Sequence, residues 1–431
     1  MALSAMTLAF IVFLLIGVPV VFSIGLCSLV TVFVAGLPGE VVFQKMVGGM
    51  QVFSFLAIPF FIFAGELMLY GGIADKIVDF AKAAVGHVRG GLGMANVVAC
   101  TLFGGISGSA GADVSAMGAV LIPVMKREGY HADYAVNVTT HAALVGVLTP
   151  TSLNIIIFTL AAGGKVSVFD MILAGIIPAV LLTASNLIAA YWVAVRRGYP
   201  KGQWPGWGTV LSTFGRALPG LFVVVLILGG ILSGMFTATE SASVAVLYAL
   251  ILTALVYRSL SWDQFVTACV KSVKTTGVVL ALIGISATFG YFLAYYSVPA
   301  LVGDWMGHVS SSPWVIFLLV NLALFVLGTF LDMAPTILVC TPIFLPICMK
   351  YGMDPIQFGI VMLLNCALGL NTPPVGTTQF IGCAIAKISV GEVMRSILPF
   401  YGSLIATMLF ITYIPSLSLW LPQLARAMAA H

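Results

Sequence analysis

Long apolar segments follow one another along almost the whole chain, separated by short polar stretches. About 20 consecutive apolar residues are needed to cross the hydrocarbon core of a bilayer as an α-helix. Repeated segments of about this length predict an all-α protein that crosses a membrane several times. The apolar segments cover residues 5–35, 53–71, 92–125, 132–160, 168–195, 215–235, 241–258, 275–296, 313–349, 356–384 and 396–422.

Two of these segments are too long for a single crossing. Residues 92–125 are interrupted by the Gly-rich and Ser-rich stretch 104–111, and residues 313–349 are interrupted around 328–335. Irregular backbone at membrane depth is tolerated only where protein or a wet cavity satisfies its polar groups. Each segment is therefore expected to turn back on itself as a helical hairpin.

Two further segments carry polar interruptions of their own. Residues 148–154 read Leu-Thr-Pro-Thr-Ser-Leu-Asn, and residues 370–377 read Leu-Asn-Thr-Pro-Pro-Val-Gly-Thr. Proline cannot continue a helix without a kink, and Ser, Thr and Asn can bond to the freed backbone groups. We expect two broken helices here, each following one of the hairpins.

The two interruptions in the first half of the chain match the two in the second half at one constant offset. A shift of 223 residues places Gly105 on Gly328 and Pro150 on Pro373. This pattern indicates an internal repeat over about 50–165 and 272–388. The same shift aligns Pro123 with Pro346, Arg127 with Lys350, Gly129 with Gly352, Gly146 with Gly369 and Thr149 with Thr372.

The positive charges indicate how the repeats are oriented. Lys and Arg favour cytoplasmic loops, and two predicted spans separate each main basic cluster from the next. The first repeat then begins outside and the second inside, so the repeats are inverted. By the same symmetry, 5–35 should form two short helices broken near residues 17–19. The basic positions are Lys126, Arg127, Arg196, Arg197, Arg258, Lys271, Lys274, Lys387 and Arg395.

The composition narrows the class of protein further. Of 431 residues, 61% are hydrophobic and 7% are charged, which leaves too few charges to cover a water-facing surface. The net charge of +4 is small and dispersed, so no nucleic-acid partner is expected. The seven cysteines form no CxxC pair, and neither a Walker loop nor an HExxH motif is present. An enzyme is not expected.

The interruptions concentrate groups that suit ions. Helix N-termini offer N–H groups to an anion, whereas helix C-terminal carbonyls, hydroxyls and amides suit a hard cation such as sodium. The same residues could instead only cap helix ends. The oxygen-bearing candidates are Ser107, Ser109, Thr149, Thr151, Ser152 and Asn154 in the first half, and Asp332, Thr336, Asn371, Thr372, Thr377 and Thr378 in the second.

Acidic residues at membrane depth are costly and are functional by default. Asp332 lies within the second hairpin's interruption and is the preferred candidate for a cation or coupling role. Asp113 follows the first interruption and could be either a cap or part of a site. Glu240 follows Thr237 at the start of a helix, where a capping role is favoured, and the role of Glu66 is open.

One histidine in an apolar segment is also notable. His141 follows two threonines within 132–160, where packing is favoured over proton transfer.

These motifs together resemble those of a known family. The chain resembles, over essentially its whole length, the large membrane subunit of tripartite ATP-independent periplasmic (TRAP) transporters. No single motif is specific for this family, but all of them together, in this order and in a chain of this length, are specific for it. The resemblance rests on the sequences at 17–19 (GVP), 57–61 (AIPFF), 104–113 (GGISGSAGAD), 236–240 (FTATE), 328–332 (GTFLD) and 371–376 (NTPPVG).

The resemblance implies a fold and an activity. The family's large subunit is an elevator-type sodium symporter with two re-entrant hairpins and two broken helices. It implies three partners: a small four-helix membrane subunit, a periplasmic substrate-binding protein, and a small organic acid such as a C4-dicarboxylate, a keto acid, a sugar acid or sialic acid. The small subunit would be a separate chain, and the location would be the bacterial inner membrane.

The resemblance also implies site residues, whereas the pattern of apolar and amphipathic segments along the chain gives the expected domain boundaries. Sodium site 1 would comprise Ser107, Ser109, Asp113, Thr149, Thr151 and Asn154; sodium site 2 would comprise Asp332, Asn371, Thr372, Gly376 and Thr377; and the substrate would meet Ser107, Gly108, Ser109, Thr149, Pro150, Asn371, Thr372 and Pro373. The expected parts are N-terminal scaffold helices (1–71), an arm (72–90), the first hairpin and broken helix (91–165), scaffold helices (166–296), a second arm (297–312), the second hairpin and broken helix (313–388) and a C-terminal scaffold helix (389–431).

The expected function is sodium-coupled import of an organic anion through alternating access, with the hairpins moving against the scaffold. A stand-alone ion-coupled carboxylate symporter or antiporter is the nearest alternative. An ion channel would need a continuous pore. A membrane-embedded hydrolase would need a nucleophile–base pair at a recognisable spacing.

Overall fold

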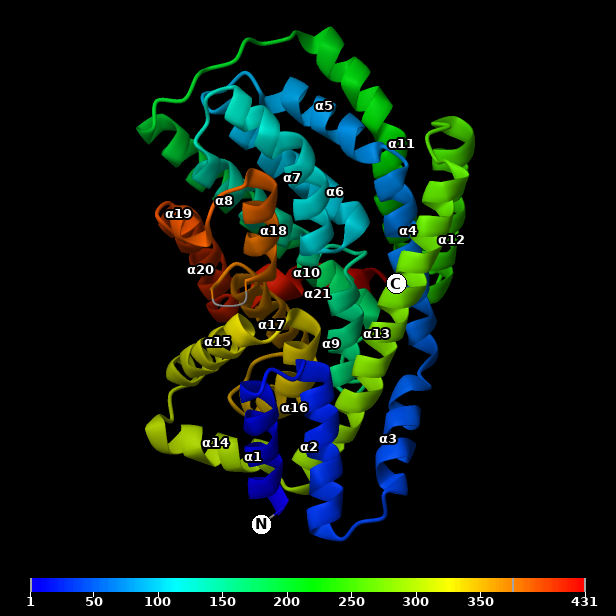
Figure 1. Cartoon of the computed structure of the whole chain (residues 1–431), viewed down its shortest axis with the longest axis vertical. Coiled ribbons are helices and arrows are strands. Elements are labelled where there is room, and N and C mark those ends of the chain that lie inside the picture. Colours follow the sequence, from blue (N-terminus) through cyan, green and yellow to red (C-terminus); the bar gives the residue numbers. More distant parts are fainter. Residues whose placement is uncertain (1, 374–375, 430–431) are drawn as a thin grey trace.

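The computed structural model describes residues 2–373 and 376–429. Within these ranges the chain is helical, without a β-strand (Figure 1). Six of the described helices are long and apolar enough to cross a membrane singly, and three bent helix pairs pass the same test together. Large apolar side chains such as Phe33 and Leu15 point outward, 88% and 81% exposed, as is expected of a surface that faces lipid.

One group of helices packs around the long helix α13 and contains the chain's N-terminus. α13 contacts α2, α3 and α4, and α12 packs on α4 and α11. The group comprises α1 (Ala2–Leu15), α2 (Val20–Ala35), α3 (Glu40–Met50), the 3₁₀ helix η1 (Phe53–Leu56), α4 (Ala57–Tyr70), α11 (Trp207–Leu232), α12 (Ala238–Leu250) with the π-helix η3 (Ile251–Val256), and α13 (Trp262–Tyr295).

Several features of this group match the sequence prediction. The 5–35 segment is two helices, α1 and α2, which pack on each other and are separated near Gly17. Glu240 caps α12: its carboxylate accepts from the Thr237 N–H at 2.8 Å, and the Thr237 hydroxyl accepts from the Glu240 N–H. This reciprocal capping box satisfies two free N–H groups at the helix start.

The first half-repeat forms the expected hairpin and broken helix. α6 (Gly91–Ser107) and α7 (Ala110–Arg127) are antiparallel neighbours joined at Gly108 and Ser109. α8 (Ala132–Ala143) continues through the 3₁₀ helix η2 (Leu144–Leu148), and α9 (Leu153–Ala161) then leaves at an angle of 51°.

The second half-repeat has the same plan. α15 (Pro313–Phe330) and α16 (Met333–Lys350) form the hairpin, which turns at Leu331 and Asp332. α17 (Pro355–Leu370) and α18 (Thr377–Ala386) form the broken helix. Pro374 and Val375 of the predicted interruption lie outside the described residues.

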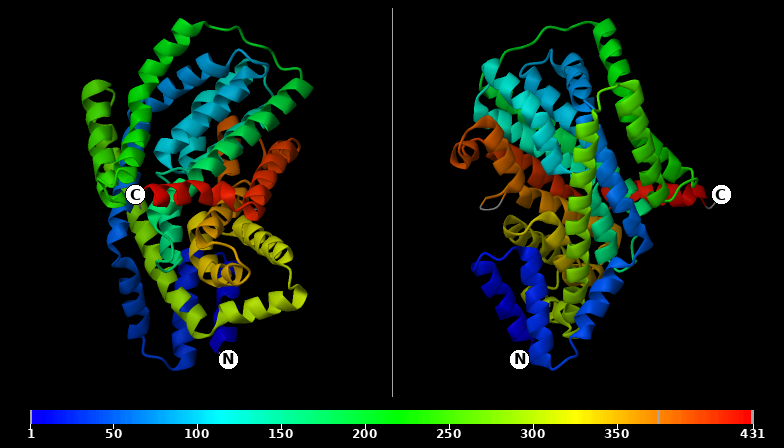
Figure 2. Two further views of the ribbon diagram at one scale, coloured as in Figure 1. Left: turned by 180° about the vertical axis from the view of Figure 1, so that it is seen from behind. Right: turned by 45° about the vertical axis from the view of Figure 1, so that its right-hand side comes forward.

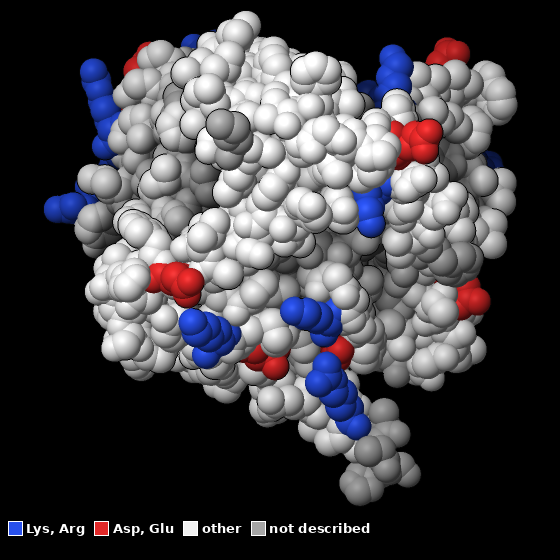
Figure 3. All heavy atoms as spheres, turned by 90° about the horizontal axis from the view of Figure 1, so that it is seen from below, with Lys and Arg blue, Asp and Glu red and all other residues white. Residues whose placement is uncertain are grey.

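Each hairpin is preceded by an amphipathic arm. α5 (Ile73–Val85) bends 68° away from α4, and α14 (Val298–Val309) connects α13 to the second hairpin. The two arms lie near opposite ends of the molecule in Figure 1, as inverted repeats require. On the face seen in Figure 3 the charged side chains are scattered, and several Lys or Arg and Asp or Glu side chains lie together below the middle of the view.

The packing of two segments differs from the predicted boundaries. α10 (Val168–Arg196), assigned to the scaffold range 166–296, packs against α6, α17 and α20 rather than α12 or α13. The range 389–431, predicted as one scaffold helix, forms α19 (Val390–Met394), α20 (Leu398–Tyr413) and α21 (Ser416–Ala429), with a 53° bend between the last two. α20 packs on α8, α10 and α17. α21 projects from the other helices towards the point marked C in the right-hand view of Figure 2.

Candidate functional site

A cavity of about 470 Å³ lies where the two hairpin tips meet the α4–α13 wall. One side carries Glu66 and neighbouring residues of α4, with Thr275 and Val279 of α13. The other side is made by Ser107–Ala112 and Asp332–Ala334 at the hairpin tips, with residues of the broken helices. Segments distant in sequence thus share one chamber between two groups of helices.

Four helix N-termini line this cavity. The first turns of α7, α9, α16 and α18 contribute Ala110, Leu153, Met333 and Thr377 to its wall. Among the described residues, the N-cap residues of α9, α16 and α18 make no side-chain hydrogen bond to the first turns of these helices. Free N–H groups and the positive end of the helix dipole favour an anion. The cavity can therefore hold a carboxylate without a basic side chain.

Asp113 anchors the first hairpin tip from behind. Its carboxylate is fully buried, and one of its oxygens accepts a hydrogen bond from the Ser107 hydroxyl. The other oxygen has no hydrogen-bond partner in residues 2–373 and 376–429. A Cβ on Gly104 or Gly146 would lie 2.8 Å or 2.6 Å from this oxygen, so both glycines are needed to admit the carboxylate. The α7 cap is instead Ser109, whose hydroxyl accepts from the Ala112 N–H.

The first hairpin tip is bonded to the first broken helix. Thr149 Oγ1 lies 2.8 Å from the Gly104 carbonyl oxygen and 2.6 Å from the Gly146 carbonyl oxygen, so its single proton is donated to this pair of acceptors, and the Thr151 hydroxyl donates to the Gly105 carbonyl. Gly108 has a φ of +63°, and a Cβ there would lie 2.3 Å from the Thr151 carbonyl oxygen. Ser107 and Thr151 are held beside the cavity by these contacts.

The second broken helix holds an amide beside a hydroxyl. Thr378 Oγ1 lies 2.7 Å from the Leu370 carbonyl oxygen and 2.5 Å from one end of the Asn371 amide. A hydroxyl has one proton, and the Leu370 carbonyl can only accept it. We therefore assign the amide nitrogen of Asn371 to face Thr378, since amide orientation follows the hydrogen-bond network. The other end of this buried amide has no partner among the described residues, and in this assignment it is an oxygen.

Neighbouring contacts fix the loop that contains Asn371. The Tyr401 hydroxyl, on α20, donates to the Asn371 carbonyl at 2.7 Å and lies 3.0 Å from Thr372 Oγ1. The Thr372 hydroxyl donates to the Leu368 carbonyl, so it is engaged within its own helix. Asp332 is an exposed residue on the cavity wall.

The predicted site residues divide into those on the cavity wall and those behind it. On the wall are Ser107, Gly108, Ser109, Thr151, Asn154, Asp332 and Thr377. Behind it, or away from it, are Asp113, Thr149, Pro150, Asn371, Thr372, Pro373 and Gly376. Thr149 and Thr372 were predicted to meet the substrate, but their hydroxyls are engaged in bonds to helix carbonyls.

Three residues were missed by sequence reasoning. Gly104 and Gly146 form the close contact around Asp113, and Tyr401 supports the Asn371 loop. The Gly-Gly pair at 104–105 was a signal of close packing. Tyr401 gave none, because nothing in the sequence places α20 beside residue 371.

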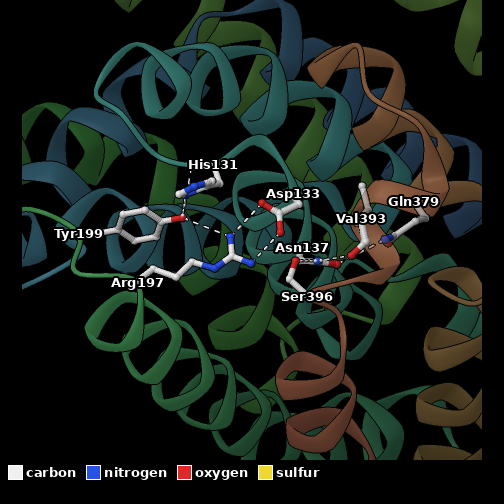
Figure 4. Close-up of polar contacts among 8 residues, drawn as sticks. All are labelled: His131, Asp133, Asn137, Arg197, Tyr199, Gln379, Val393 and Ser396. Carbon is white, nitrogen blue, oxygen red and sulfur yellow. Dashed lines mark hydrogen bonds and ion pairs between the residues drawn. The ribbon is translucent and has the colours of Figure 1, made fainter.

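A polar network ties the two broken helices together (Figure 4). Asn137 on α8 donates to the Val393 carbonyl at 3.0 Å and to the Ser396 hydroxyl at 2.9 Å. The Gln379 amide on α18 contacts the Asn137 side chain at 3.4 Å and accepts from the Thr140 hydroxyl. Because buried polar networks rigidify what they join, these bonds hold α8 and α18 in one block.

The same network continues to the end of α10. Arg197 makes a bidentate ion pair with Asp133, with distances of 2.9 and 2.7 Å. This contact raises the pKa of the Arg197 guanidinium above its ordinary value. The Tyr199 hydroxyl lies 2.9 Å from His131 Nδ1 and accepts from Arg197, so the loop after α10 is attached to the start of α8.

His141 on α8 lies between Asn137 of the polar network and the aromatic side chains of α20. The side chain is buried, its Nδ1 contacts the Asn137 carbonyl at 2.9 Å, and its ring packs beside Phe400 and Tyr401. These contacts fit the packing role favoured from the sequence.

Comparison with known proteins gives a consistent result. Residues 7–417 match the family described as "Tripartite ATP-independent periplasmic transporter, DctM component". The chain is 41% identical to the uncharacterized protein YgiK of Salmonella typhimurium, with 96% of each chain covered. It is 32% identical to the C4-dicarboxylate TRAP transporter large permease protein DctM of Rhodobacter capsulatus, covering 96% of this chain and 97% of that one.

A second functional relative and a solved structure extend this comparison. The sialic acid TRAP transporter large permease protein SiaM of Vibrio cholerae is 34% identical, with 95% of each chain covered. The YdaH transporter of Alcanivorax borkumensis has a similar fold, with a TM-score of 0.61, 13% identity and 88% of each chain covered. At that identity, the likeness to YdaH concerns the fold alone.

Proposed function

This chain belongs to the DctM family, the large permease components of TRAP transporters, and on that premise we propose that it imports a small organic acid together with sodium ions. It is a multi-pass inner-membrane transport protein and not an enzyme. The observation that carries the proposal is the cavity lined by four helix N-termini between two hairpin tips.

The N-termini support binding of an organic acid. A carboxylate placed among α7, α9, α16 and α18 would receive N–H groups that have no side-chain cap on three of these helices. The relatives' names give the substrate classes to test first, a C4-dicarboxylate for DctM and sialic acid for SiaM.

The oxygens beside and behind the tips support binding of sodium. The free amide oxygen of Asn371 is buried, and Asp332 is an exposed residue on the cavity wall. On the first half, Ser107 and Thr151 present hydroxyls beside the carbonyls of the α6 terminus. Oxygen donors of these kinds are the ligands that hard cations prefer.

Binding and movement would be coupled through the tips. Each cation would draw a hairpin tip against its broken helix and so complete the anion site between them. The hairpins, the broken helices, α10 and α20 form one packed group, and the cavity lies where that group meets α4 and α13. An elevator movement would slide the first group past the second, with α5 and α14 as connections.

Two partner proteins complete the proposal. As in other transporters of this family, a small membrane subunit would associate with the permease, and a periplasmic protein would deliver the substrate. The permease would then depend on both for uptake.

Uptake into proteoliposomes tests this function. The permease is reconstituted with its small subunit, and a labelled C4-dicarboxylate or sialic acid is supplied with its binding protein, with and without an inward sodium gradient. The variant is Asp332→Asn, and the matched control is Asp304→Asn, which removes an exposed carboxylate from arm α14.

We expect uptake that needs sodium and the binding protein, that is lost in D332N and that is retained in D304N. Uptake that needs sodium but no binding protein would favour a stand-alone symporter. Uptake that is indifferent to sodium would overturn the assignment of the cation sites.

A further inference from the structure

The cavity has an unusual balance of charge. Among the described residues on its wall, the charged side chains are Glu66 and Asp332, and none is Lys or Arg. Asp332 belongs to the hairpin side, where a sodium ion would balance it. Glu66 belongs to the opposite wall, on α4, and has no part in the proposed cation sites.

Glu66 lies close to the first hairpin tip. Its neighbour Gly65 faces Ser107, and a Cβ on Gly65 would lie 3.7 Å from the Ser107 carbonyl oxygen. The Glu66 Oε2 atom is buried and has no hydrogen-bond partner within the part of the chain that the structure describes. Glu66 thus brings a free acceptor to the same cavity that the first turn of α7 lines.

No cation within the described residues neutralises Glu66 by direct contact. Lys271 on α13 is the neighbouring cation, but it forms no ion pair with Glu66 within 4 Å. The Lys271 ammonium instead lies over the Tyr70 ring, 5.0 Å from its centre. The electrostatic preference of this wall is therefore for a hydrogen-bond donor and against a second negative charge.

We propose that the substrate is a hydroxylated monocarboxylic acid, and that Glu66 selects it over dicarboxylic acids. Its carboxylate binds the helix N-termini at the hairpin tips, and a hydroxyl at its other end donates to Glu66. A second carboxylate at that end would face Glu66, with repulsion in place of a hydrogen bond. This inference rests on the proposed function and narrows its substrate class.

The test uses pairs of acids that differ at one end. Threonate and tartrate have the same four-carbon chain, but a terminal hydroxymethyl group in threonate replaces one carboxylate of tartrate. Gluconate and glucarate form the same pair with six carbons. The permease purified with its small subunit is titrated with each acid in sodium or in potassium, and thermal unfolding reports the half-saturating concentration. Omitting the binding protein keeps its own specificity out of the result.

Glu66→Gln is the variant, and Glu40→Gln is its matched control. Glu40 is an exposed carboxylate at the start of α3, in the same group of helices but away from the cavity. The Gln side chain keeps the size of Glu66 but removes the charge.

In sodium, we expect wild type and E40Q to bind each monocarboxylate about tenfold more tightly than its dicarboxylate partner, and E66Q to reduce this ratio to about threefold or less. Equal or tighter dicarboxylate binding by wild type would overturn the proposal, as would an unchanged ratio in a folded E66Q. If E66Q does not fold, the ratio of dicarboxylate to monocarboxylate half-saturating concentrations in wild type alone decides whether the proposed preference for monocarboxylates holds. If no acid binds, or if binding is equal in potassium, the proposed function itself fails.

Discussion

Gly369 on α17 packs directly against the main chain of Gly328 on α15. A Cβ on Gly369 would lie 2.2 Å from the Gly328 carbonyl oxygen. In the first half, Gly146 approaches Gly104 in the same manner, with a Cβ on Gly104 only 2.8 Å from the Gly146 Cα. Both hairpins therefore meet their broken helices through a contact of bare backbone, which a side chain at Gly369 or at Gly104 would prevent.

This contact predicts a sharp effect of one added methyl group. Gly369→Ala should separate α15 from α17, lower stability by roughly 1–3 kcal/mol and abolish most uptake. The control is Gly402→Ala on α20, where a Cβ meets nothing within 4 Å. Thermal unfolding in detergent and sodium-driven uptake measure the two effects. Wild-type behaviour of G369A would contradict the packing described here.

The assignment of the Asn371 amide can be tested through Thr378. Thr378→Val removes the acceptor that holds the amide nitrogen, and the amide oxygen should lose its fixed direction. We expect sodium affinity to fall about tenfold in this variant. Thr378→Ser keeps the hydroxyl and should retain most of the affinity. The sodium dependence of uptake gives both values, and equal affinities in the two variants would count against the assignment.

Much of the fold could be predicted from the sequence, because its main signals are local. Gly, Pro and Ser/Thr interruptions within apolar segments locate the hairpins and broken helices, and their constant offset indicates the repeat. The positions of α10 and α20 could not be predicted in this way. Which of several similar apolar helices pack together depends on tertiary fit, and their sequences are equally apolar.

The site could also be predicted only in part, because local sequence signals place its residues at the interruptions but do not give their tertiary contacts. The sequence locates hydroxyls such as Ser107 and Thr149 at the interruptions, but a helix turn decides which of them faces the cavity. Thr149 faces helix carbonyls and Ser107 lines the cavity. The role of Gly104 depends on an Asp113 oxygen that approaches it, which no local pattern contains.

Tyr401 should act as a positioning residue for the second cation site. Tyr401→Phe removes the hydroxyl that holds the Asn371 carbonyl, and should weaken sodium affinity roughly three- to tenfold with little change in the KM for substrate at saturating sodium. The matched control is Tyr413→Phe on the same helix, whose hydroxyl donates to the Trp314 carbonyl far from the cavity. A purely structural role would lower stability and leave sodium affinity unchanged.

The two ion pairs should differ in their contribution to stability. The side chains of Arg197 and Asp133 are 27% and 19% exposed, whereas the Arg426 side chain paired with Asp170 is 60% exposed. Since solvent screens the second pair more strongly, a double-mutant cycle should give about 1–2 kcal/mol for the first pair and under about 1 kcal/mol for the second. The cycles combine R197Q with D133N and R426Q with D170N, and are measured by thermal unfolding. Equal coupling energies would contradict this ranking.

Asp113 should be needed for sodium affinity more than for helix stability. Its carboxylate accepts a hydrogen bond from the Ser107 hydroxyl. The N-terminus of α7 is capped by Ser109 and not by Asp113. Asp113→Asn has nearly the same shape, but it would place an amide NH₂ against Gly104 and Gly146, or turn it towards Ser107 and reverse that hydrogen bond. Either arrangement changes the direction of the Ser107 hydroxyl at the tip. We expect sodium affinity to fall at least about tenfold, with the protein still folded in detergent. Ser109→Ala, which removes the cap, should instead lower thermal stability by about 1 kcal/mol. If D113N behaved as S109A does, the carboxylate would have only a structural role.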